Sequence, residues 1–170
     1  ACTERLKPGL VKSYATPSAT SITLTMKTGL RFNNGRKVEM EDIVFSLSRV
    51  VAEAAPGVAD LLEPIAGYGQ VHGDVQVEDP DDPAAERLTG VQRLTTTSVQ
   101  IALSRPLPEF VHRLALPLAA IVPDDLAGAT PEEFARAPVC VGPYRVGTPY
   151  TNKSAEVRLV RAEKHSAVNE

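Results

Sequence analysis

The side chains that could support catalysis or hold a metal are few and scattered along the 170 residues. The three histidines, His72, His112 and His165, lie far apart, and no cysteine stands at a ligand spacing from any of them. A zinc site needs three or four ligands at defined spacing. The carboxylates of residues 78–82 suit calcium better, but they lack the alternation and the glycine of a calcium loop. We therefore expect no metal and no other cofactor, and interpret the acidic run as a solvated loop.

Motifs for nucleophilic catalysis and for nucleotide binding are absent from the sequence as well. The sequence contains no Gly-x-Ser-x-Gly elbow, and it contains no phosphate loop or dinucleotide fingerprint. Asp42, Ser46 and Arg49 recur at helical spacing, and side chains so placed routinely meet on a helix surface. We interpret these three as a helix-surface hydrogen-bond set, and we predict that the protein is not an enzyme.

The bulk composition indicates a folded domain. Hydrophobic residues make up 43% of the chain and charged residues 23%, which is enough to bury a core. The net charge of -3 argues against a nucleic-acid partner, because proteins that bind nucleic acid carry a stripe of basic residues. No apolar run approaches the roughly 20 residues of a membrane span, and residues 1–5 are too polar and short for a signal peptide. We expect any targeting segment to lie outside these residues.

The strongest local pattern covers residues 21–51. Ile22, Leu24 and Met26 alternate with polar residues, which is typical of a strand with one buried face. Glycine and asparagine at 29–35 predict turns. Residues 36–51 then carry an apolar stripe at helical spacing, with acidic residues crowding the first turn, where the helix dipole favours them. The segment therefore predicts strand, turn and helix.

The rest of the chain predicts an α+β fold with a mixed, mostly antiparallel sheet and packed helices. Strands are predicted at 11–15, 90–95 and 98–104 and around Val157 and Leu159, and residues 118–123 are predicted to be a buried strand that ends at proline. The strand at 11–15 would pair with 21–27 through a turn at 16–20, and the strands at 90–95 and 98–104 would flank a turn at Thr96 and Thr97. Pro56 and Gly57 end the long helix, and a further helical turn follows within 58–65. Residues 106–110 open another helix. Residues 67–90 are predicted to be an exposed loop, with room for a short helix at 84–88.

The central segment resembles a known family. Residues 29–35 read Gly-Leu-Arg-Phe-Asn-Asn-Gly, residues 38–43 read Val-Glu-Met-Glu-Asp-Ile, and residues 45–49 read Phe-Ser-Leu-Ser-Arg. This succession of strand end, Phe-x-x-Gly turn and acid-led helix resembles the extracellular solute-binding proteins of peptide and nickel ABC importers, family 5. Glu39 stands where that family usually has threonine, which is the better N-cap.

A second motif lies about a hundred residues further on. Residues 138–144 read Pro-Val-Cys-Val-Gly-Pro-Tyr, where the family reads Pro-Val-Gly-Thr-Gly-Pro-(Tyr/Phe). We expect Gly142 to permit a tight backbone approach before the next strand. Residues 6–14 and 90–106 also match the family in collinear order, so the resemblance covers nearly the whole chain.

The resemblance implies part of a periplasmic-binding-protein-like class II architecture. Residues 1–116 would form the small β-rich subdomain of lobe 1, and residues 117–170 would be returning strands of the large lobe. The second lobe would be absent from these residues. We therefore expect a fragment that does not bind solute on its own.

By the same resemblance, the intact protein would be an exported, extracellular or cell-envelope component of an ABC importer. Its partners would be a peptide or other small solute and the ABC permease. It would meet the membrane only through the permease or a lipid anchor outside these residues. Tyr68 and His72 are candidate solute contacts, since loops of the small subdomain can reach the rim of the family's cleft. The alternatives are an ordinary surface loop for those two residues and a stand-alone cell-surface interaction module for the chain.

The two cysteines, Cys2 and Cys140, leave two interpretations open. They are either a pair of buried thiols or a disulfide, which an exported protein would favour. Closing so long a loop would stabilise the fold by about 4 kcal/mol in the entropy model. A lipid anchor on Cys2 would need an apolar signal run before it and a flexible tether after it, and neither is seen.

Overall fold

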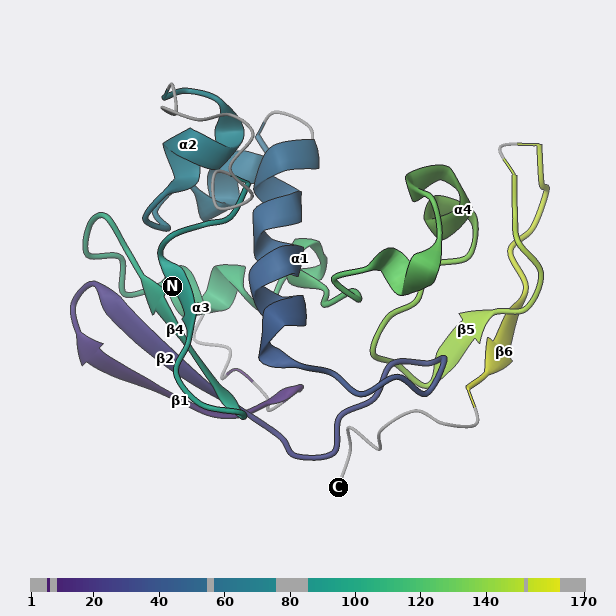
Figure 1. Cartoon of the computed structure of the whole chain (residues 1–170), viewed down its shortest axis with the longest axis horizontal. Helices are drawn as coiled ribbons and strands as arrows, with labels where there is room; N and C mark the ends of the chain where they lie inside the picture. The colour runs from purple at the N-terminus through teal and green to yellow at the C-terminus, as the bar shows by residue number, and fades with distance from the viewer. Residues whose placement is uncertain (1–5, 7–8, 55–56, 76–85, 152, 163–170) are drawn as a thin grey trace.

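A four-stranded antiparallel sheet lies on one side of the protein, at the left in Figure 1. The computed structural model describes residues 6, 9–54, 57–75, 86–151 and 153–162. The strands are β1 (Val11–Ser18), β2 (Ser21–Met26), β3 (Val91–Arg93) and β4 (Ser98–Ala102), in the order β1-β2-β4-β3. The two predicted hairpins and the α+β class are confirmed. The first turn is tighter than predicted, because β1 continues to Ser18 and only two residues separate it from β2.

The alternating face of β2 is buried, as its period of two predicts. Ile22 lies opposite Ile101 and Leu24 opposite Val99, and all four side chains are buried. Facing residues on one side of a sheet pack directly against each other. The main core combines this face with the apolar stripe of the long helix and with side chains from the covering turns, among them Phe32, Ile43, Leu47, Val51, Leu62, Ile65, Leu88 and Phe110.

The long helix α1 (Met40–Glu53) packs across this face and stands nearly upright in Figure 1. It begins four residues later than predicted. The reason is that the turn before it closes as a small hairpin, in which the N–H of Phe32 donates to Arg36 and that of Val38 donates to Leu30. Residues 36–38 therefore pair with residues 30–32, and the helix begins after them. The Asp42 carboxylate accepts the backbone N–H of the N-cap, Glu39, at 2.7 Å, which offsets the weak capping residue.

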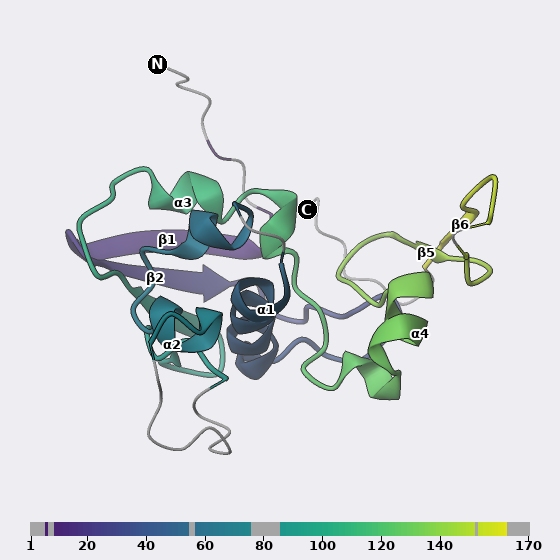
Figure 2. The same ribbon diagram turned by 90° about the horizontal axis from the view of Figure 1, so that it is seen from above.

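Short helical turns cover the rest of the core. They are η1 (Ala59–Leu62), α2 (Tyr68–His72), α3 (Phe110–Arg113) and η2 (Pro117–Ala119). Figure 2 shows α3 beside β1 and α1 nearly end-on. The further helical turn predicted within 58–65 and the helix opened by residues 106–110 are confirmed.

Two predictions about connecting segments are wrong. Residues 67–75 are not an exposed loop, because Gly67 and Gly73 adopt left-handed backbone on either side of α2 and Tyr68 is buried. Residues 118–123 are not a strand, because Pro117 starts a 3-10 turn and the N–H of Val122 donates to a serine of α1 instead of to a neighbouring strand. Of the segment 84–88, residues 84 and 85 lie outside the described residues and 86–88 form a turn that is not helical.

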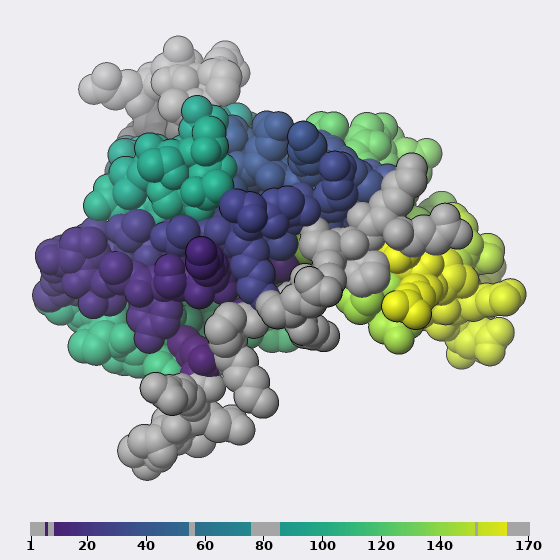
Figure 3. All heavy atoms as spheres, turned by 90° about the horizontal axis from the view of Figure 1, so that it is seen from below, coloured from purple at the N-terminus to yellow at the C-terminus, as the bar shows by residue number. Residues whose placement is uncertain are grey.

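The last part of the chain extends away from the sheet. It contains η3 (Leu126–Gly128), α4 (Pro131–Arg136) and an antiparallel ribbon of β5 (Tyr144–Val146) and β6 (Leu159–Arg161). We call residues 9–121 the body and residues 122–162 the arm. In Figure 3 the first strands and the end of the arm occupy opposite ends of the long axis. Leu159 lies in β6 as predicted, whereas Val157 lies just before it.

A close backbone approach that excludes a side chain is found at Gly90 and not at Gly142. A Cβ at Gly142 would meet nothing within 4 Å, so the predicted tight approach there is wrong. A Cβ at Gly90 would lie 2.7 Å from the Ala102 carbonyl oxygen and 2.8 Å from both N and O of Ala66.

Among the described residues, no helix is long and apolar enough to cross a membrane.

Candidate functional site

The predicted solute contacts, Tyr68 and His72, are neighbours on α2. Their rings stack with centroids 4.9 Å apart. The Tyr68 hydroxyl donates to Asp60 at 2.9 Å, and His72 Nδ1 lies 3.0 Å from an Asp74 carboxylate oxygen. Burial of the phenol, and then the hydrogen bond to Asp60, raise the pKa of Tyr68 to about 12. The Tyr68 hydroxyl is thus already partnered within the body, while His72 stays half-exposed. Whether either touches a solute stays a prediction.

The other candidates for metal chemistry do not converge. His112 lies exposed on α3, and His165 and the acidic residues 78–82 lie outside the described residues. Within the described part of the chain, no three histidine, cysteine or acidic side chains are grouped so that they could hold a metal ion.

The two motifs found in the sequence meet in space where the body joins the arm. Asn33, in the Phe-Asn-Asn-Gly turn, donates its backbone N–H to the Cys140 carbonyl at 2.9 Å. Its side-chain amide donates to the Tyr144 carbonyl at 3.3 Å and points to the Cys140 sulfur at 3.8 Å. Asn33 is itself only 6% exposed. The turn at 32–35 is therefore a docking point for residues more than a hundred positions later.

A charged network lies beside this contact. The Asp42 carboxylate is fully buried and accepts Arg36 Nη1 at 2.7 Å and the N–H of Asp124 at 3.0 Å. The second terminal nitrogen of Arg36 pairs with the Asp124 carboxylate at 2.5 Å. Burial alone would lower the pKa of Arg36, but the hydrogen bond from Arg36 to Asp42 and the charges of Asp42 and Asp124 outweigh it, so the pKa of Arg36 is raised. Such pairing is what keeps a buried carboxylate stable.

One turn further along α1, Ser46 makes a second link to the arm. Its hydroxyl accepts the N–H of Val122 at 2.9 Å and lies within donating distance of the Asp42 carbonyl at 2.6 Å and the Val122 carbonyl at 3.2 Å. Next along the helix, the Arg49 guanidinium lies 5.9 Å from the centre of the Phe134 ring of α4, within cation–π range.

These contacts correct the sequence interpretation of Asp42, Ser46 and Arg49. They are not only a helix-surface set, although Ser46 does bond back to Asp42 and Arg49 does pair with Glu53. Their shared face of α1 points at the arm. We call Asn33, Arg36, Asp42 and Ser46, together with the arm residues that they bond, the junction.

Cys140 belongs to the junction and has no disulfide partner among the described residues. Burial raises its pKa, which makes the thiolate less available at neutral pH. Cys2 lies outside the described residues, so the disulfide between the two stays a prediction.

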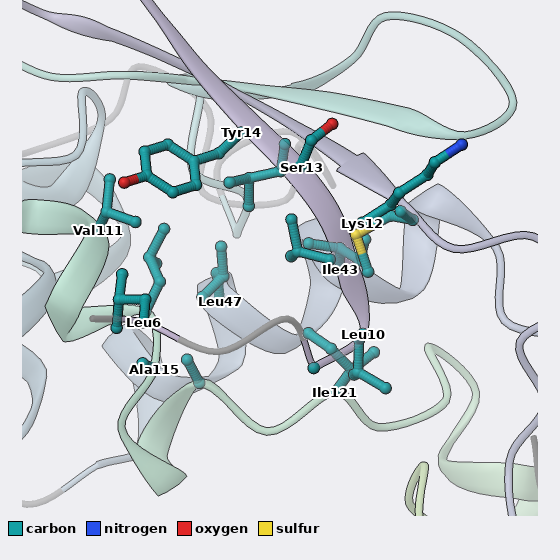
Figure 4. Close-up of a pocket in the computed structure, with 16 residues that line it drawn as sticks. Leu6, Leu10, Lys12, Ser13, Tyr14, Ile43, Leu47, Val111, Ala115 and Ile121 are labelled. Atoms are coloured by element: carbon teal, nitrogen blue, oxygen red, sulfur yellow. The ribbon is translucent and has the colours of Figure 1, made fainter. Parts of the chain in front are cut away.

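An apolar groove opens in the body. It has a volume of about 520 Å³ and lies between β1, α1 and α3. In Figure 4 the Tyr14 ring and the Ile43 and Leu47 side chains border it. The other lining side chains are mostly aliphatic, among them Leu6, Leu10, Leu24, Met26, Val111, Leu114, Ala115 and Ile121. The few polar groups at its edge come from Lys12, Ser13 and Tyr14. The groove could take apolar groups but offers no acid–base pair.

Comparison with known proteins gives a consistent result. The sequence profile of the bacterial extracellular solute-binding proteins, family 5 Middle, matches residues 5–166. No curated protein matches. Among solved structures, clavulanic acid biosynthesis oligopeptide binding protein 2 superposes with a TM-score of 0.73 at 24% identity, over 94% of this chain and 28% of that one.

Two further structures agree. An oligopeptide ABC transporter substrate-binding domain from Bacillus anthracis has a TM-score of 0.72 at 17% identity, over 94% of this chain and 30% of that one. NikA from Staphylococcus aureus in complex with Ni(L-His)2 has a TM-score of 0.67 at 22% identity, over 92% of this chain and 27% of that one. This chain therefore spans less than a third of the length of each structure.

Proposed function

Since the chain belongs to family 5 of the bacterial extracellular solute-binding proteins, we propose that it is part of the solute-capture component of an ABC importer. The solute would be a peptide or another small molecule, which the intact protein would hand to the ABC permease. The observation that carries this proposal is the family match over residues 5–166, which is nearly all of the chain. The relatives described as oligopeptide-binding and the nickel–histidine complex of NikA support the class of solute.

The proposal divides the chain as the sequence suggests, into a small β-rich subdomain over 1–116 and returning strands of a large lobe over 117–170. The second lobe would lie outside these residues. The ribbon of the arm supports this division. Each of its strands pairs only with the other among the described residues, and Tyr144 and Leu159 are more than half exposed. Two-stranded ribbons are marginal alone, and they gain stability when further strands or helices cover them.

Catalysis has no place in the proposal. The family and the fold are those of binding proteins. The junction uses its charged groups to pair with one another, and the groove presents mainly aliphatic carbon. Capture would proceed by closure of two lobes around the solute, as hinged binding proteins do.

We place the solute site outside the apolar groove. A peptide carries charged ends and backbone polar groups, and a site that binds it must supply matching donors and acceptors. The groove offers Lys12, Ser13 and Tyr14 at one edge and apolar side chains elsewhere. The 170 residues alone would therefore bind peptide weakly, and affinity would need the second lobe.

Isothermal titration calorimetry with a mixed set of two- to eight-residue peptides tests this. The complete reading frame that contains these residues should bind at least one peptide with a micromolar or tighter Kd, and the 170-residue chain should show no binding at millimolar peptide. Tight binding by the 170 residues would overturn the assignment of the site. Failure of the complete protein with peptides and with nickel chelates would overturn the function.

The location follows from the family. A member of an extracellular family would act outside the cytoplasm, at the cell envelope, and would be held there by the permease or by a lipid anchor. The alternative, a cell-surface interaction module without a transport role, draws on the apolar groove beside the exposed strand β1. Deleting the genes of the ABC permease distinguishes the two functions. If the protein is the transport component, loss of the permease should give the same phenotype as loss of the protein, whereas the phenotype of a stand-alone module should not depend on the permease.

A further inference from the structure

We infer that the junction makes the body and the arm one rigid unit, and that Asp42 is its central positioning residue. The inference rests on the proposed function, since it states which parts of the receptor do not move during capture. Relative motion is the default expectation where two parts of a chain meet through a small interface. The junction is therefore expected to hold only if its contacts are buried and directional.

Asp42 meets both conditions. Its carboxylate is 0% exposed and accepts three donors: the Arg36 guanidinium at 2.7 Å, the Glu39 N–H at 2.7 Å and the Asp124 N–H at 3.0 Å. The first two come from the body and the third from the arm. A carboxylate that is buried with three donors has little freedom, because losing any one leaves a charge less well compensated.

Arg36 pairs with both Asp42 and Asp124 and so links the body to the arm a second time. Its two terminal nitrogens divide between the two carboxylates, at 2.7 Å to Asp42 and 2.5 Å to Asp124. Asp124 is thus held twice, through its backbone N–H by Asp42 and through its side chain by Arg36. A residue fixed at both its backbone and its side chain cannot rotate without breaking a charged hydrogen bond.

The junction holds the arm at three places along its sequence. Ser46 bonds Val122, the Arg36–Asp42 pair bonds Asp124, and Asn33 bonds Cys140 and Tyr144. A single contact would let the arm pivot, whereas three separated contacts fix its rotation as well as its position. Val139 and Val141 pack partly against the main core and add apolar contact at the third place.

It follows that the body and the arm move together when the solute is captured. The junction would then not be a hinge of the proposed receptor. Asp42, Arg36 and Asn33 would then act on binding only through the orientation they impose.

A distance measurement between two spin labels by double electron–electron resonance tests the inference without any solute. The labels are placed at Thr95→Cys in the body and Thr148→Cys in the arm, both exposed and outside the junction, with the native cysteines replaced by serine. The parent should give one narrow distance distribution. Asp42→Ala should widen it at least twofold, and Asn33→Ala should widen it less, because two anchors remain.

Asp60→Asn is the matched control. Asp60 also holds a buried partner, the Tyr68 hydroxyl, but entirely within the body. Its variant should lower stability and leave the distance distribution unchanged. If Asp42→Ala does not fold, Ser46→Ala and Asn33→Ala carry the test. A broad distribution in the parent, or folded junction variants with the parental width, would overturn the inference. The calorimetric test of the proposed function is unaffected by either result.

Discussion

Gly90→Ala tests how closely the sheet packs against the turn at 64–66. Gly90 lies where three backbone segments meet. Its N–H donates to Ala66 at 2.8 Å, its carbonyl accepts the N–H of Ala102 at 2.7 Å, and Ala66 donates to Ala102 at 2.9 Å. A methyl group here would lie 2.7–2.8 Å from three backbone atoms. None of these atoms can rotate away, so the segments must separate.

The magnitude follows from two costs. Forcing a methyl group into a packed site costs about 1–3 kcal/mol. Stretching the buried backbone hydrogen bonds adds about 1 kcal/mol for each bond that is weakened. We expect Gly90→Ala to lower the free energy of unfolding by about 3 kcal/mol, the sum of a mid-range packing cost and one weakened bond. With a urea m-value of about 2 kcal/mol/M, the midpoint would fall by roughly 1.5 M.

Gly142→Ala is the matched control, because its Cβ would enter open space and its φ is not in the left-handed region. It should be neutral, or stabilising by up to about 0.5–1 kcal/mol through the lower entropy of the unfolded chain. Both variants are compared by urea unfolding followed by far-UV circular dichroism. If Gly90→Ala loses no more stability than Gly142→Ala, the close packing described for Gly90 is refuted.

Two further predictions concern titratable groups. The pKa of Tyr68 is raised from its unfolded value of 10 to about 12, so the unfolded chain loses this proton first and stability should fall as the pH rises from about 10 to about 12. Tyr68→Phe should remove that part of the stability loss in urea titrations at pH 9–12, and an unchanged loss in the variant would contradict the raised pKa. If the predicted disulfide forms, the oxidised chain should show no free thiol with a colorimetric reagent, and its free energy of unfolding should fall by about 4 kcal/mol on reduction. Two reactive thiols in the unfolded oxidised chain would show that Cys2 and Cys140 are unpaired.

Much of the body could be predicted from local pattern. The alternation of Ile22, Leu24 and Met26 set the buried face of β2, because side chains of a strand alternate between two faces. The stripe that includes Ile43 and Leu47 set the face of α1 that packs on the sheet. These features depend on neighbours within a few residues, so the sequence carries them.

The connecting segments were harder to predict, since their conformation depends on distant partners. Residues 118–123 have the composition of a strand, yet the N–H of Val122 bonds Ser46, so no strand pairing forms there. Tyr68 lies in a glycine-rich stretch that predicts a loop, and it is buried because Asp60 supplies a partner for its hydroxyl. Composition alone does not reveal either partner.

The sequence by itself determined the family, the two hairpins and the apolar face of the long helix, because each depends on short-range spacing or on collinear motifs. Only the tertiary structure decided that Gly90, and not Gly142, needs to be glycine, and that the two motifs touch. Asn33 and Cys140 lie 107 positions apart, and no local rule sets their contact. Their meeting is fixed by the path of the chain between them, which directs Asp42, Ser46 and the turn at 32–35 towards the arm.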